Sequence, residues 1–65
     1  MNKYLKQKIE EKHISQTELA KRCGVGRSHI SQIIHKKVKP SLELLYNISI
    51  VLNIDIGELI KSIIE

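Results

Sequence analysis

Residues 15–35, SQTELAKRCGVGRSHISQIIH, hold two short amphipathic segments separated by a turn that contains two glycines. Ser15 and Glu18 have the spacing of a capping box. In this motif the serine hydroxyl accepts from the backbone N–H of Glu18, and the glutamate side chain reaches back to the N–H of Ser15. Gly24 stands where a helix commonly ends on a left-handed residue. The pattern therefore predicts a helix over residues 16–23.

The segment after the turn predicts a second helix over residues 27–35, with Gly26 as its N-cap. At 100° per residue, Ile30 and Ile33 centre on one side, and His29 and Ile34 lie on the flanks. The opposite face, called the reading face below, carries hydrogen-bonding side chains and no acid: Arg27, Ser28, Ser31, Gln32 and His35. Such side chains suit base edges and phosphates, so we expect this face to lie against DNA.

The remaining segments also read as helices. Asn2 can cap a first helix over residues 2–12, and Pro40 followed by Ser41 marks the start of another over residues 42–52. The main apolar stripe expected for that helix is Leu42, Leu45, Ile48 and Leu52, with Leu44, Tyr46, Ile50 and Val51 in addition.

Asp55 and Glu58 resemble a second capping box and begin a last helix over residues 56–64. No segment alternates as a strand would. The fold class that we expect is all-α, in one domain over residues 1–65.

Composition narrows the class of protein. Residues 1–40 hold 10 Lys/Arg and 3 Asp/Glu, a net charge of +7, whereas residues 41–65 hold 1 and 4, a net charge of −3. A basic half beside an acidic half suggests that one face meets a polyanion. The two aromatic residues, Tyr4 and Tyr46, are too few for the stacking platforms of single-strand binders.

Other function classes have little support in the sequence. Cys23 is the one cysteine, which excludes a disulfide framework, and His13, His29 and His35 lack metal-site spacing. With no acid/base, metal or cofactor constellation, we do not expect an enzyme. No apolar run is long enough to span a bilayer and no signal peptide is present, so we expect a cytoplasmic protein.

Two longer motifs carry a family resemblance. SQTELAKRCGVGRSHISQI (15–33) and KPSLELLYNISIVLNIDIGELI (39–60) resemble the DNA-binding domain of the lambda/Cro-type phage repressor family, the XRE-type helix-turn-helix. The likeness runs from about residue 9 to residue 60. It implies a five-helix lambda-repressor-like domain in which residues 27–35 form the recognition helix.

The resemblance assigns base contacts to Arg27, Ser28 and Gln32, and backbone contacts to Gln16 and to the three lysines after the recognition helix. The other contacts given next are expectations from the residues themselves. Base contacts are expected from Arg27, Ser28, Ser31 and Gln32. Contacts to the DNA backbone are expected from Gln16, Thr17, His29, His35, Lys36, Lys37 and Lys39. The last three lysines lie in what we call the lysine loop, residues 36–39.

The chain departs from the family pattern at four positions. Family members often have Gly where this chain has His13, Lys36 and Asn53, and Ser or Thr where it has Gly26. Asparagine tolerates the left-handed conformation, whereas histidine and lysine tolerate it less well. Lys36 is therefore expected either to be strained or to extend the recognition helix.

The C-terminal half carries more apolar side chains than a small core needs. Ile50, Val51, Ile56, Ile63 and Ile64 either close that core or form a dimer interface. We favour the interface, because a lone module this small binds DNA weakly and exposed isoleucine patches are costly in a monomer.

The resemblance implies a sequence-specific double-stranded DNA-binding transcriptional regulator. The form expected is a repressor of phage or mobile-element type that acts as a homodimer on a pseudo-palindromic operator. A protein antagonist is one route by which it would be controlled. The alternative is a protein-interaction module, such as an antitoxin of the same fold, whose partner would meet the apolar C-terminal half.

Overall fold

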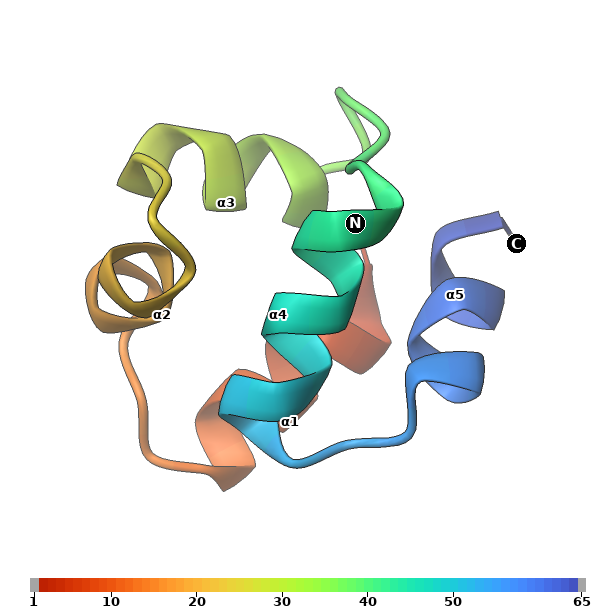
Figure 1. Ribbon diagram of the computed structural model, residues 1–65, viewed down its shortest axis with the longest axis horizontal. Coiled ribbons are helices and arrows are strands. Elements are labelled where there is room, and N and C mark those ends of the chain that lie inside the picture. The colour runs from red at the N-terminus through yellow and green to blue at the C-terminus, as the bar shows by residue number, and fades with distance from the viewer. Residues whose placement is uncertain (1, 65) are drawn as a thin grey trace.

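The computed structural model describes residues 2–64, which form five helices and no strand (Figure 1). The helices are α1 (Lys3–Glu11), α2 (Gln16–Cys23), α3 (Arg27–Ile34), α4 (Leu42–Leu52) and α5 (Ile56–Ile64). Each end lies within one residue of the predicted end. The expected all-α, five-helix class is confirmed.

The helices surround one apolar core. α2 packs against α3 and α4, α4 packs against α5, and α1 packs against α3 and α5. In Figure 1, α3 crosses one end of the molecule, α4 runs down the front, and α2 and α5 lie on opposite sides. Every helix supplies at least one fully buried side chain: Leu5, Leu19, Ile30, Ile33, Ile34, Ile48, Leu52 and Leu59. Each contributes about 1.5–3 kcal/mol relative to an exposed side chain.

The predicted N-caps form. Their side-chain oxygens accept backbone N–H groups as follows: Asn2 from Leu5 at 3.0 Å, Ser15 from Glu18 at 3.0 Å, Ser41 from Leu44 at 3.1 Å, and Asp55 from Gly57 and Glu58 at 2.6 and 3.2 Å. The second hydrogen bond predicted for the Ser15 capping box, from the N–H of Ser15 to the Glu18 carboxylate, is wrong. The Glu18 carboxylate lies 3.0 Å from Nε of Arg22 instead, because an arginine one turn further along the helix is within its reach.

Left-handed residues stand just after four helices, α1 to α4, and one of them is Lys36. Gly24 has φ 75°, and His13, Lys36 and Asn53 have φ 55°, 59° and 53°. Lys36 therefore takes the strained conformation, and α3 stops at Ile34 rather than extending. The left-handed conformation costs a non-glycine residue roughly 1–2 kcal/mol.

Two packing expectations are wrong. Leu42 was assigned to the buried stripe of α4 but is 68% exposed, and Leu44, treated as additional, is buried. The cause is that α4 is apolar around most of its surface, so periodicity alone does not choose the side that meets α2 and α5. Ile34, placed on a flank of α3, is also fully buried, because α1 packs against that side.

Candidate nucleic-acid interface

The turn between α2 and α3 sets the position of the recognition helix. Gly24 caps α2 in the left-handed conformation, and the N–H of Val25 donates to the carbonyl of Ala20 at 3.0 Å. Ala20 is buried and small, which lets α3 approach α2 closely. Ile30 of α3 is buried in the same core. The two helices are therefore held as a packed pair, with the opposite side of α3 facing outward.

The reading face of α3 is exposed over most of its extent. Arg27, Ser28, Gln32 and His35 are exposed, whereas Ser31 is half-buried. The helix wheel placed the four exposed residues correctly but did not predict the half-burial of Ser31. Ser31 has less free surface than the others, so its short hydroxyl is the least accessible of the expected base contacts.

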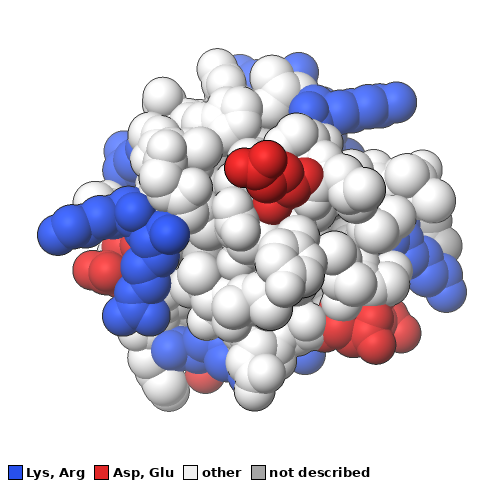
Figure 2. All heavy atoms as spheres, viewed as in Figure 1, with Lys and Arg blue, Asp and Glu red and all other residues white. Residues whose placement is uncertain are grey.

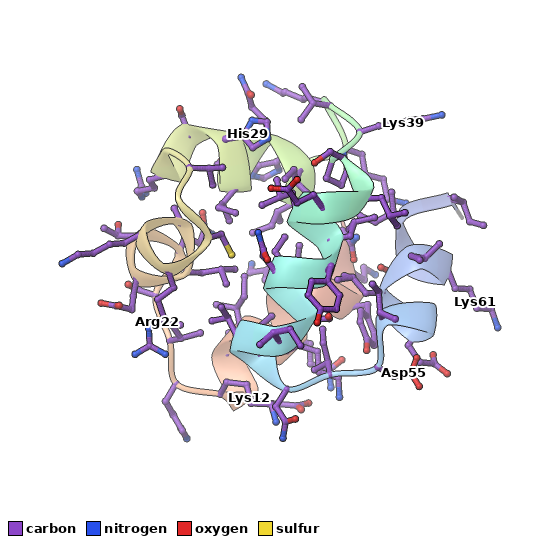
Figure 3. All side chains as sticks on the ribbon, viewed as in Figure 1. Lys12, Arg22, His29, Lys39, Asp55 and Lys61 are labelled. Atoms are coloured by element: carbon purple, nitrogen blue, oxygen red, sulfur yellow. The ribbon has the colours of Figure 1, made fainter. Side chains whose placement is uncertain are left out.

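The residues expected to contact the DNA backbone lie at several helix ends. Thr17 is exposed and Gln16 is half-buried in the first turn of α2. His29 is half-buried, and its side chain lies at the same end of the molecule as Lys39 (Figure 3). Lys12 lies at the opposite end. The three lysines of the lysine loop are exposed: Lys36, Lys37 and Lys39.

The cations at this end of the molecule form no ion pair within residues 2–64. Within residues 2–64, the ion pairs are Lys8 with Glu11 at 3.3 Å and Arg22 with Glu18 at 3.0 Å. Neither involves Arg27 or the lysine loop. Basic side chains project at the end formed by α3 and the lysine loop, and at other edges of the molecule (Figure 2). The cations beside the reading face are therefore available to phosphates, and each neutralised phosphate adds about −0.9 to the slope of log K against log salt.

Three further features of the described residues bear on other kinds of site. No group of three or more His, Cys, Asp or Glu side chains within residues 2–64 is placed to hold a metal ion. Cys23 is half-buried, and burial raises the pKa of its thiol. No described helix is long and apolar enough to cross a membrane.

The residues expected at a dimer interface are divided between two helices. Ile50 of α4 and Ile64 of α5 are 62% and 76% exposed. Val51, Ile56 and Ile63 are half-buried, and Val51 and Ile63 also pack against the core.

Sequence reasoning missed two members of an exposed apolar row. Tyr46, which is 56% exposed, lies one turn before Ile50 on the same side of α4, and Leu42 lies two turns before it. Their spacing of i, i+4, i+8 is present in the sequence, but Leu42 was assigned to the buried stripe of this helix, so the row was not recognised. We call these three residues the α4 stripe. The surface over α4 is largely uncharged apart from a small acidic spot (Figure 2).

The fold and the exposed face define a helix-turn-helix domain with a recognition helix. Residues 5–59 match the family model described as Helix-turn-helix. The "ImmF control region 10 kDa protein" of Bacillus phage phi105 is 40% identical over 55 residues, which make up 85% of this chain and 61% of that protein. This chain belongs to the helix-turn-helix family, of the Cro/lambda type found in phage regulators. It matches less than two thirds of the length of this relative.

Proposed function

We propose that the protein is a sequence-specific double-stranded DNA-binding transcriptional regulator that represses by occluding its operator. The observation that carries the proposal is the exposed, acid-free reading face of α3 beside cations that have no carboxylate partner within residues 2–64. The phage control-region relative supports the regulatory role.

Base reading is assigned to the longer side chains of the reading face. Arg27 has the geometry to donate two hydrogen bonds to O6 and N7 of guanine, and Gln32 to pair with N6 and N7 of adenine. Ser28 and Ser31 are shorter and act through water or at close approach. The residues proposed to contact the DNA backbone are Gln16, Thr17, His29, His35, Lys36, Lys37 and Lys39.

We infer that the protein binds as a homodimer. A single module of this size buries too little DNA surface for tight binding, so a second copy is needed. The α4 stripe is the largest exposed apolar row among the described residues, and its nearly uncharged surroundings let a second basic chain approach. Ile56, Val51, Ile63 and Ile64 extend this surface onto α5. A two-fold dimer would place its recognition helices about 34 Å apart, so the operator would be a pseudo-palindrome.

Selection of bound sequences from random duplex DNA tests the proposal directly. The expected result is an enriched pseudo-palindrome with half-sites one helical turn apart. Enrichment of a single half-site would remove the dimer while keeping the DNA-binding role. Failure to enrich any sequence would shift the assignment to an interaction module such as an antitoxin.

A further inference from the structure

Asn2 lies where three helices meet and makes more contacts than a helix cap needs. It is only 2% exposed, although it stands at the start of the described chain. Its Oδ1 accepts the N–H of Leu5 at 3.0 Å, which caps α1. Its Nδ2 donates to Oγ of Ser62 on α5 at 3.3 Å, and its backbone N–H donates to the carbonyl of Ile34 on α3.

The contact with Ile34 completes the end of the recognition helix. The last four carbonyls of a helix have no partner within it. In α3, three of them accept from residues just beyond the helix: Ser31 from His35 at 3.0 Å, Ile33 from Lys36 at 3.1 Å and Gln32 from Lys37 at 2.8 Å. The fourth, that of Ile34, accepts from Asn2. A buried carbonyl without a partner is costly, so the start of the chain stabilises the end of α3.

The contact with Ser62 explains why the residue is asparagine. For capping alone, Ser or Asp would serve as well as Asn at this position. The hydroxyl of Ser62 already donates to the carbonyl of Leu59 at 2.7 Å, so its oxygen must accept from Asn2. The asparagine amide supplies the cap acceptor and this donor on two separate atoms, Oδ1 and Nδ2. An aspartate would place a buried carboxylate against an oxygen without a proton to share.

We propose that Asn2 is a positioning residue for DNA recognition. It holds the C-terminal end of α3 at a set position relative to α1 and α5. The lysine loop begins two residues after Ile34, so the same contact sets the position of its cations. Gln32 and His35 stand at this end of the helix and depend on it in the same way. The inference rests on the proposed DNA-binding function.

Two substitutions at one position isolate the backbone contact. Asn2→Ala and Asn2→Pro both remove the cap and the bond to Ser62, but only proline lacks the N–H that reaches Ile34. The φ of Asn2, −79°, is within the range that proline adopts. Without DNA, we expect the amide hydrogens of Lys36 and Lys37 to exchange roughly tenfold faster in Asn2→Pro than in Asn2→Ala. Amides of α2 should exchange equally in the two variants.

A second experiment measures DNA binding, with the duplex that the wild-type protein selects from random sequence. Asn2→Pro should bind it roughly tenfold more weakly than Asn2→Ala, with equal binding to an unrelated duplex. A destabilised but correctly shaped α3 would instead lower both affinities together. Equal exchange at Lys36 and Lys37 in the two variants would overturn the proposal, whether or not DNA binds. If no duplex is selected, the proposed function fails, and the exchange comparison still decides whether the N–H of Asn2 holds the end of α3.

Ser62→Ala keeps the inference testable if Asn2→Pro does not fold. This variant retains the cap and the N–H of Asn2 but removes the acceptor on α5. Faster exchange confined to the end of α3 and to the start of α1 would support the junction. A wild-type exchange pattern would contradict it, because α5 would then not be coupled to α3 through Asn2.

Discussion

The lysine loop supplies a quantitative prediction about salt. Lys37 and Lys39 are exposed, stand beside the reading face and pair with no carboxylate within residues 2–64. If each neutralises one phosphate, replacing both by Gln should make the slope of log K against log salt less steep by about 1.8. Between about 50 and 200 mM salt, the wild-type affinity should then fall roughly 12-fold more than that of the variant.

The matched control removes the same charge elsewhere. Lys12 and Lys61 are exposed and lie away from the lysine loop in Figure 3. Replacing both by Gln lowers the net charge equally, so any effect of overall charge is shared by the two variants. Lys36 is left intact because its left-handed backbone would complicate the comparison.

Fluorescence anisotropy of a labelled duplex, titrated at several salt concentrations, measures the slope. The duplex is the one selected by wild-type protein, and circular dichroism establishes that both variants are folded. The reasoning is refuted if the variant of the lysine loop and the control variant have the same slope. That result would mean that the loop does not contact phosphates and that the basic charge acts only at long range.

Further predictions concern specificity, stability and assembly. Arg27→Ala should cost about 1–3 kcal/mol of discrimination at one guanine position, seen as a relaxed preference there when binding sites are selected again. His13→Gly should raise the free energy of unfolding by about 0.5–1 kcal/mol in urea titration, since relief of left-handed strain exceeds the entropy added to the unfolded chain. Gly24→Ala should lower the free energy of unfolding by about 1 kcal/mol. No neighbouring atom lies within 4 Å of the added methyl group, so the loss would come from backbone strain and not from a clash, and a neutral result would contradict the strain argument. Replacing Tyr46 and Ile50 by Asp should give a monomer in sedimentation equilibrium with the fold intact, and an unchanged mass would move the dimer interface to α5 or remove it.

Most of the candidate site was predictable because its signals are local. Arg27, Ser28, Gln32 and His35 follow from the period of one helix, and the exposed face they form agrees with the wheel. The half-burial of Ser31 did not follow, because neighbouring segments limit its exposure. The contact roles of these residues stay predictions until DNA binding is measured.

Two predictions about packing were wrong for the same physical reason. Leu42 and Leu44 exchange the positions expected for them, because α4 offers apolar side chains in most directions and its partners choose among them. Ile34 was placed on a flank because periodicity within α3 cannot report that α1 packs there. Each outcome depends on a helix that is distant in sequence.

The sequence by itself determined where the helices of this protein begin and that α2 ends at Gly24, whereas the end of α3 before Lys36 came from the structure. Caps, glycines and Pro40 act through hydrogen bonds and steric limits that span at most four residues, so they can be read along the chain. Only the tertiary structure decided which side of α4 is exposed and that Asn2 meets Ile34 and Ser62. The physical reason is that these contacts join residues far apart in the sequence. Which side chains are buried, and which group bonds the last carbonyl of a helix, depend on the segment that packs there, and no local sequence pattern specifies that segment.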